Sequence, residues 1–320
     1  MLSKILHYTL LVLRRIYFII SNNNEEHRNR KMFSNKEYAN DLIYKQLMNK
    51  EPCMIARFGS TEMNCIVNYL GVKNKNKNYL GFIKGDILEW WWKKSFIVQM
   101  KSNAGFFPSH VDKIEQFCKL MIEDAKEVDI LGSWLIKEKY IKNEIKNAKQ
   151  LVLEDLEPFF TTNPWTKALE GKKVLVIHPF SESIEDQYKK RELLFENNLL
   201  PQFELKTIKA VQSLQGEKVK FIDWFEALDS MKNQMDQTNY DICIVGAGAY
   251  GFPLTAHAKR SGKKAIHLAG VTQLLFGIKG KRWENFLFWP YMNLFNEHWV
   301  RPSVKENPKN ANQVEGSCYW

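Results

Sequence analysis

The chain has 320 residues, of which 45% are hydrophobic and 13% aromatic, and this composition excludes disorder, collagen and coiled coil as its main state. The length is sufficient for one large domain or two modest ones with a real core. Lys and Arg exceed Asp and Glu to give a net charge of +10, so the surface should attract phosphates, nucleic acid or an acidic membrane face.

Residues 5–20 are apolar apart from His7, Thr9 and the pair Arg14 and Arg15. A helix of this length covers about 24 Å, less than the ~30 Å of a bilayer's hydrocarbon core, and no small-residue cleavage site follows it. The arginines favour a helix in the membrane interface beside anionic headgroups, and packing on the body of the protein or on a partner chain is the alternative. We expect residues 1–22 to bind the membrane surface of a cytoplasmic protein, peripheral on the inner face of the cell membrane.

Apolar runs of strand length alternate with helical patterns through the rest of the chain. We expect strands at 53–58, 128–134, 150–154, 173–178, 203–210, 240–245 and 264–268. We expect helices at 38–47, 60–70, 86–100, 115–125, 187–196, 224–237 and 253–261. This alternation predicts an α/β fold, Rossmann-like, with a mainly parallel sheet and helices on both faces.

The domain organisation follows from the absence of internal repeats and of Pro/Gly/Ser linkers. Residues 35–300 should form one α/β domain, preceded by an amphipathic helix and linker (1–34) and followed by an extended tail (301–320) that wraps the surface. The cysteines are odd in number and lack metal-ligand spacing, so we expect reduced thiols. They are Cys53, Cys65, Cys118, Cys243 and Cys318.

The segment 246–251 (GAGAYG) is a GxGxxG motif between an expected strand and a helix that opens with Pro253. In this context backbone N–H groups and a helix dipole can face a phosphate. A dinucleotide site also needs an acidic residue about 20 positions further on, and no Asp or Glu occurs from Phe252 to Trp283. NAD is therefore disfavoured, and two interpretations remain equal: a cradle for another phosphate, or tight packing of strand against helix.

The segment 57–62 (RFGSTE) lies where the first strand meets a helix, at the edge where parallel sheets bind ligands. Arg57 is suited to a phosphate, and Glu62 to a metal or a hydroxyl. The spacing alone favours the simpler interpretation of a capped helix start, with Ser60 or Thr61 as the cap and Glu62 at the positive helix end.

His178 ends another expected strand and can serve as a general base or as a hydrogen-bond donor to phosphate. Without a partner carboxylate in the sequence, a structural role is the commoner outcome. The run 90–92 (WWW) is either a sugar-stacking platform or, more commonly, core. The basic runs match no nucleic-acid module, so we expect no nucleic acid partner.

Several blocks resemble bacterial proteins of capsule and surface-polysaccharide clusters, and those proteins resemble the GT-D glycosyltransferase fold. The resemblance covers about residues 35–320 and is carried by ARFGSTE, NPWTKALEGKKVLV, IHPFSESIEDQYKKRELLF and DICIVGAGAYGFPLTAHAKRSGKKAIHLAGVTQLLFGIKGKRW. In GT-D enzymes the first turn reads RFGDGE, whose Asp and Glu contribute to the metal and sugar-nucleotide site. This chain keeps Glu62 but has Ser60 in place of the Asp. The resemblance implies Mn²⁺ or Mg²⁺ at Glu62, weakened because a hydroxyl is a poorer ligand than a carboxylate.

The resemblance implies a glycosyltransferase that moves a sugar from a nucleoside-diphosphate donor to a lipid-linked or surface-polysaccharide acceptor. Glu62 and His178 are the candidate catalytic residues. The candidate donor-binding residues are Arg57, Gly59, Ser60, Gly246, Gly248, Tyr250, Gly251, Gln273, Lys279, Lys281 and Arg282. The alternatives are an NAD-dependent oxidoreductase, which the missing acid disfavours, and a catalytically inactive scaffold of a polysaccharide assembly complex, which Ser60 suggests.

Overall fold

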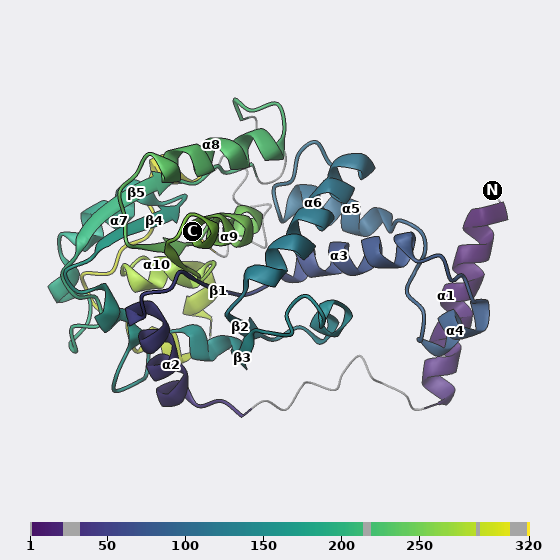
Figure 1. The fold of residues 1–320 in the computed structure, drawn as a ribbon, viewed down its shortest axis with the longest axis horizontal. Coiled ribbons are helices and arrows are strands. Elements are labelled where there is room, and N and C mark those ends of the chain that lie inside the picture. Colours follow the sequence, from purple (N-terminus) through teal and green to yellow (C-terminus); the bar gives the residue numbers. More distant parts are fainter. Residues whose placement is uncertain (1, 22–32, 214–218, 286–288, 308–318) are drawn as a thin grey trace.

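A seven-stranded, all-parallel sheet forms the centre of the protein (Figure 1). The structure is a computed structural model that describes residues 2–21, 33–213, 219–285, 289–307 and 319–320. The strands are β1 (Cys53–Ala56), β2 (Ile130–Ser133), β3 (Lys149–Val152), β4 (Lys173–His178), β5 (Glu204–Lys209), β6 (Ile242–Val245) and β7 (Lys264–His267), in the order β3-β2-β1-β7-β6-β4-β5. The expected Rossmann-like α/β fold with a parallel sheet is confirmed.

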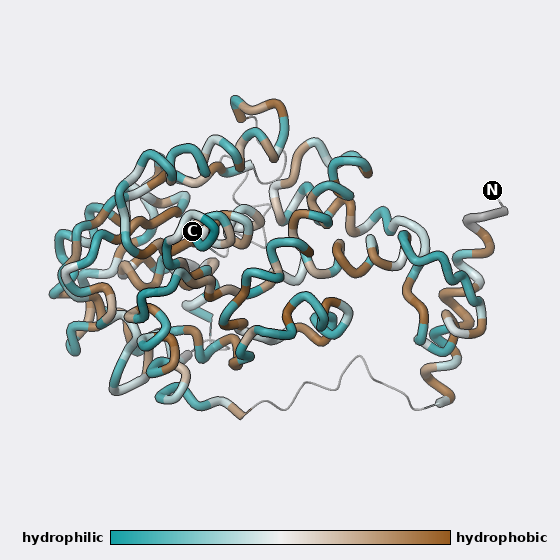
Figure 2. The backbone as a smooth tube through the Cα atoms, viewed as in Figure 1, coloured by the Kyte–Doolittle hydropathy of each residue, from teal (hydrophilic) through white to brown (hydrophobic). Residues whose placement is uncertain are grey.

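Helices cover both faces of the sheet, because successive side chains of a strand point to opposite sides. β1 sends Met54 and Ala56 into one core and Cys53 and Ile55 into the other. The first face is covered by α3 (Ser60–Lys73), α5 (Lys94–Ser102), α6 (Val111–Asp124), α8 (Trp224–Asp236) and α9 (Gly251–Arg260). The second is covered by α2 (Lys36–Met48), α7 (Ser181–Tyr188), α10 (Val271–Leu275) and α11 (Trp289–Met292). Figure 2 shows the brown, hydrophobic positions concentrated along the strands between these layers.

The direction of strand addition reverses at the middle of the sheet. The first three strands extend outward from β1, and the later strands occupy the other half, with β7 paired to both β1 and β6. In open parallel sheets, ligands bind beyond the carboxyl ends of the strands at such a reversal. This edge is therefore where a site is expected.

Two expected helices differ from the structure. Of residues 86–100, only the part from Lys94 is helical, because the side chain of Asn68 donates to the carbonyl of Trp91 and accepts from the N–H of Lys93, both at 2.9 Å, and holds this segment extended. The helix expected at 187–196 begins earlier, at Ser181, and ends at Tyr188.

The earlier start of α7 has a distant cause. The buried carboxylate of Glu306 accepts from the N–H groups of Glu182, at 2.9 Å, and Ser183, at 3.4 Å, and also from the Ser183 hydroxyl. These N–H groups belong to the first helical turn and have no partner within the helix. A residue from the C-terminal segment therefore caps α7.

The N-terminal helix α1 (Leu2–Ile20) packs against α4 (Tyr79–Lys84) beyond the far end of α3 (Figure 1). Leu10 is buried with Phe82 and Ile87, and the His7 ring stacks on Trp91 with centroids 4.0 Å apart. Neither Trp90 nor Trp91 lines the cavity described below, and both belong to this small cluster. The described helices include none long and apolar enough to cross a membrane.

Arg14 faces inward and not toward solvent. Its guanidinium lies 4.9 Å from the centre of the Phe82 ring and donates to the carbonyl of Ile87 at 3.4 Å. The opposite face of α1 is an exposed apolar surface, which we call the outer face. It consists of Ile5, Leu6, Tyr8, Val12, Leu13, Ile16, Ile19 and Ile20.

The four cysteines within the described residues are free and buried, as expected, and Cys318 lies outside those residues. Of the tail expected to wrap the surface, residues 308–318 are also outside the described residues. Tyr319 and Trp320 line a cavity, and Trp320 is buried.

Candidate functional site

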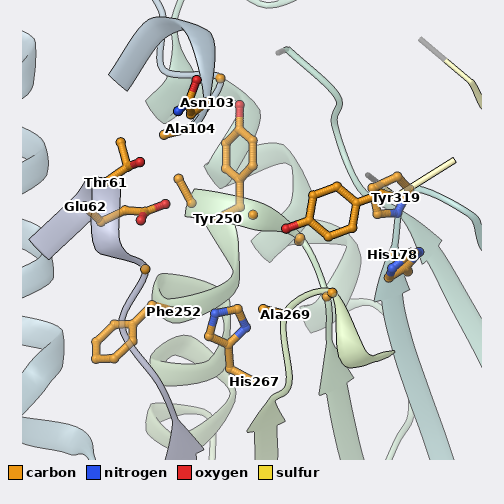
Figure 3. Close-up of a pocket in the computed structure, with 18 of the residues that line it drawn as sticks. Thr61, Glu62, Asn103, Ala104, His178, Tyr250, Phe252, His267, Ala269 and Tyr319 are labelled. Carbon is orange, nitrogen blue, oxygen red and sulfur yellow. The ribbon is translucent and has the colours of Figure 1, made fainter. Parts of the chain in front are cut away.

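A cavity of about 260 Å³ lies beyond the carboxyl ends of β1, β4, β6 and β7 (Figure 3). The loops that follow these strands form its walls, and the segments 103–105 and 211–213 close one end. It brings together predicted site residues that are far apart in the sequence. They are Arg57, Gly59, Ser60, Glu62, His178, Gly246, Gly248, Tyr250, Gln273 and Arg282.

Three predicted donor-binding residues do not line this cavity. Gly251 packs against the ring of His267. The ammonium of Lys279 lies 6.0 Å from the centre of the Phe295 ring, and the Lys281 side chain is exposed to solvent. Of the basic residues predicted at 279–282, Arg282 therefore lines the cavity, and Lys279 and Lys281 do not.

Helix α3 presents its amino end to the cavity without a side-chain cap. Its N-cap is Gly59, which has no side chain to donate, and Ser60 is already the first helical residue. The expected cap by Ser60 or Thr61 is therefore not formed, whereas Glu62 does lie in the first turn of the helix, as expected. The first N–H groups of a helix lack partners within it and carry partial positive charge, so this end of α3 is suited to an anion.

Gly59 also makes room for Glu62. A β-carbon at Gly59 would lie 1.8 Å from Oε2 of Glu62, so the carboxylate packs directly against the glycine backbone. In Figure 3 this carboxylate points into the cavity. The RFGSTE segment thus combines a helix start whose N-cap has no side chain with the Glu62 carboxylate folded back onto that N-cap.

Arg57 is held over an indole ring. Its guanidinium carbon lies 5.0 Å from the centre of the Trp134 ring, and Trp134 donates from Nε1 to the carbonyl of Phe58 at 2.9 Å. The buried carboxylate of Glu138 fixes this turn by accepting from the N–H of Trp134 at 3.2 Å. Burial lowers the pKa of the Arg57 guanidinium and the nearby Glu62 carboxylate opposes that shift, although an arginine stays charged in either case.

The glycines of the GAGAYG segment have different roles. A β-carbon at Gly246 would lie 2.6 Å from Cδ2 of His178, and one at Gly251 would lie 2.2 Å from Cε1 of His267. Gly248 has a φ of 52°, and a β-carbon there would meet no atom within 4 Å. The two outer glycines accommodate histidine rings, and the middle one leaves open space at the cavity wall. The packing interpretation therefore fits Gly246 and Gly251, and the phosphate cradle stays a prediction for Gly248.

His178 is buried, and its tautomer is set by the backbone. Its Nδ1 accepts from the N–H of Phe180 at 3.0 Å, which leaves the ring hydrogen on Nε2. Burial lowers its pKa to about 3, so the ring is neutral near pH 7. In this state Nε2 can donate a hydrogen bond, which suits contact with a phosphate or sugar oxygen better than proton abstraction.

His267 ends β7 and was not singled out in the sequence. Its Nδ1 lies 3.2 Å from the carbonyl of Val245, and since a carbonyl can only accept, Nδ1 carries the hydrogen and Nε2 is left as an acceptor. Burial, and next the positive charge of Arg57, lower its pKa to about 3. The two histidines at this sheet edge are thus both neutral and have opposite tautomers.

The ionisable lining favours an anionic ligand. Among the described residues that line the cavity, Arg57 and Arg282 are the cations and Glu62 is the only carboxylate. The described part of the chain contains no group of three or more His, Cys, Asp or Glu side chains that could hold a metal ion. Glu62 is therefore the one carboxylate side chain of the described lining that a divalent cation could use, and Mg²⁺ held by one carboxylate takes its other ligands from water and substrate phosphates.

Sequence reasoning missed several lining residues. His267 could have been found, because it ends a strand as His178 does. Trp134 follows β2 in the same way. Asn103, Ser213, Tyr319 and Trp320 carry no local signal, because the folding of distant segments brings them to the cavity.

The structure also shows which residue occupies the position that binds the ribose in a dinucleotide site. In the dinucleotide fold, an acidic residue ends the strand that follows the glycine-rich turn and its helix. Here that strand is β7, and it ends with neutral His267.

No protein-family model, curated protein or solved structure matches this chain.

Proposed function

We propose that the protein is a glycosyltransferase that takes a sugar from a nucleoside-diphosphate donor. The observation that carries this proposal is the convergence of Arg57, Arg282 and the uncapped amino end of α3 on one cavity at the strand-order reversal. Guanidinium groups and helix N-termini are favourable partners for phosphate oxygens. The GT-D resemblance of the flanking segments supports the same class of reaction.

Departure of the diphosphate is the step that this arrangement assists. When the bond between the anomeric carbon and the phosphate oxygen breaks, negative charge develops on the leaving group. Arg57 and Arg282 lie where they can neutralise it, and the Nε2–H of His178 can donate to a phosphate or sugar oxygen. Donors fixed before the reaction lower the barrier, because they need no reorganisation during it.

Glu62 serves the sugar side of the reaction. Its carboxylate points into the cavity and can accept hydrogen bonds from the hydroxyls of the donor. We infer that it takes the proton that the acceptor hydroxyl loses when its oxygen bonds to the anomeric carbon. The described residues include no group of three or more metal-ligating side chains, and no step of this proposal passes through a metal ion.

The acceptor in this proposal is a lipid-linked or surface-polysaccharide glycan at the membrane, and α1 supports that location. Its outer face exposes apolar side chains, including Ile19 at 70% and Ile20 at 79%. An amphipathic helix of this kind can lie in the lipid interface. Arg14 is used to fix α1 to its neighbours, so Arg15, which is exposed, is left at the edge of the outer face to contact anionic headgroups.

Calorimetric titration tests the proposal. UDP, GDP, CDP and NADH are titrated into the parent protein and into Arg282→Ala. We expect one nucleoside diphosphate to bind, NADH to give no signal, and the variant to bind about 10-fold to 150-fold more weakly, the value of a charge-assisted hydrogen bond. Tight NADH binding would overturn the transferase, and no nucleotide binding would favour the inactive scaffold.

A further inference from the structure

Tyr319 lines the cavity but is far in the sequence from most of the other lining residues. Its ring packs on Gly270, where a β-carbon would lie 2.6 Å from Cε1 of the tyrosine. Its carbonyl accepts from Nε2 of the buried Gln273 at 3.2 Å. In Figure 3 its hydroxyl points into the cavity from the side opposite Glu62. The ring and backbone are therefore held, and the hydroxyl is directed at the ligand space.

The partner of that hydroxyl is Arg282. Nη1 of Arg282 donates to the Tyr319 hydroxyl at 3.0 Å, and the guanidinium carbon lies 4.6 Å from the centre of the tyrosine ring. The turn that carries Arg282 is held by the same segment, because the N–H of Lys281 donates to the main-chain oxygen of Trp320 at 3.4 Å. A second arginine, Arg301, donates to the same oxygen at 3.0 Å.

This contact matters because a long cationic side chain has many rotamers. Ordering such a side chain costs up to about 2 kcal/mol of conformational entropy, and a preformed contact removes that cost before the ligand binds. One N–H of Arg282 is directed to the Tyr319 hydroxyl, and a guanidinium carries five N–H groups in a fixed planar arrangement.

We propose that Tyr319 is a positioning residue that holds the Arg282 guanidinium in the cavity for the diphosphate of the donor. This inference rests on the proposed function, because it takes the anion to be that diphosphate. Tyr319 acts through Arg282, and its loss weakens diphosphate binding only while the arginine is present.

A double-mutant cycle tests this inference, with inorganic pyrophosphate and UDP as the probes in calorimetric titration. Tyr319→Phe keeps the ring on Gly270 and removes the hydroxyl. We expect it to weaken binding by about threefold to tenfold, the value of one hydrogen bond. In an Arg282→Ala background the same change should alter the affinity by less than about twofold. Tyr44→Phe, on α2 and away from the cavity, is the matched control.

A second variant guards against a folding artefact. Gly270→Ala should displace the tyrosine ring, since the new β-carbon would overlap it, and should weaken pyrophosphate binding in the same direction as Tyr319→Phe. Thermal unfolding of each variant shows whether it is folded. Full loss of affinity from Tyr319→Phe in the Arg282→Ala background would mean that Tyr319 contacts the anion directly, and the positioning role would fall. Unchanged affinity in Tyr319→Phe alone would also refute it and leave the transferase intact, whereas no binding of either probe to the parent would overturn both.

Discussion

The backbone of Gly251 lies directly against the imidazole of His267, so closely that a β-carbon on the glycine would be 2.2 Å from Cε1 of the ring. This glycine belongs to a motif associated with phosphate binding, yet its role here is to admit a side chain of the neighbouring strand. Gly248 of the same motif has open space beside it. The two positions should therefore respond differently to the same substitution.

We expect Gly251→Ala to destabilise the fold by about 1–3 kcal/mol, because the methyl group must displace a buried ring. Gly248→Ala should cost about 1–2 kcal/mol, since its φ of 52° is unfavourable for alanine, and the methyl group would also enter the ligand space. Urea unfolding gives the stabilities, and titration of UDP gives the affinities. If Gly248→Ala leaves UDP affinity unchanged in a folded protein, the phosphate does not approach this turn.

The two buried histidines make stability depend on pH in acid. Their pKa values are lowered from 6.5 to about 3 in the folded protein, so between these values the unfolded chain binds more protons. The contribution of the two histidines to stability should therefore be complete above about pH 6.5 and fall as the pH drops, by up to about 1.4 kcal/mol per unit for each histidine.

The variant His178→Asn isolates the contribution of the His178 ring to the pH dependence of stability. Asparagine keeps an acceptor for the N–H of Phe180 but does not titrate. Urea unfolding at a series of pH values between about 4.5 and 7 should give a shallower slope for this variant than for the parent. Equal slopes would show that His178 is not kept neutral by burial.

Glu62→Gln should abolish most turnover and leave the fold intact. The amide keeps the shape against Gly59 but cannot take a proton from the acceptor, so we expect the rate to fall by about 100-fold or more. The assay measures sugar transfer from a sugar nucleotide that has the same base as the nucleoside diphosphate found to bind in the titration. Glu51→Gln, at an exposed site before β1, is the control. A near-normal rate in Glu62→Gln would remove the carboxylate from the reaction.

The outer face of α1 should bind anionic lipid. Replacing Val12 and Ile16 by serine removes apolar surface that would enter the interface, at about 1.5–3 kcal/mol for each fully buried side chain, and should lower binding to phosphatidylserine vesicles by at least 10-fold. Sedimentation with vesicles measures this. Val98→Ser, at a 53% exposed valine on α5, is the matched control and should bind as the parent does. Vesicle binding that survives in the double variant would point to a different contact surface.

Local patterns in the sequence predicted the sheet well. The strand at 173–178 was placed to the residue, and the other six expected strands overlap those observed, because buried parallel strands are short apolar runs bounded by turns. The same rule brought Arg57, Glu62, His178 and Gly246 to one edge, since the carboxyl ends of parallel strands share it.

Local patterns could not predict contacts between residues that are far apart in the sequence. Glu306 caps α7 from more than 100 residues away, and nothing near Ser181 indicates this. Arg14 looked like a headgroup ligand because its sequence neighbours are apolar, whereas α4 supplies its partner. Tyr319 is also held at the cavity by a residue distant in the sequence, Gly270, and no local sequence pattern predicts that contact.

The pairing of β1 with β7 has a consequence for how the chain is made. Cys53 is paired with Lys264, roughly 210 positions later, so the middle of the sheet cannot close until the ribosome has released those further residues. At about 5–20 residues per second, β1 waits on the order of ten seconds or more with one edge unpaired, a state prone to aggregation. Arg57 and Gly246 meet only when β7 inserts between their strands. Nascent chains shorter than this length should therefore depend on chaperones and bind no nucleotide, and the cavity should be among the last features of the protein to form.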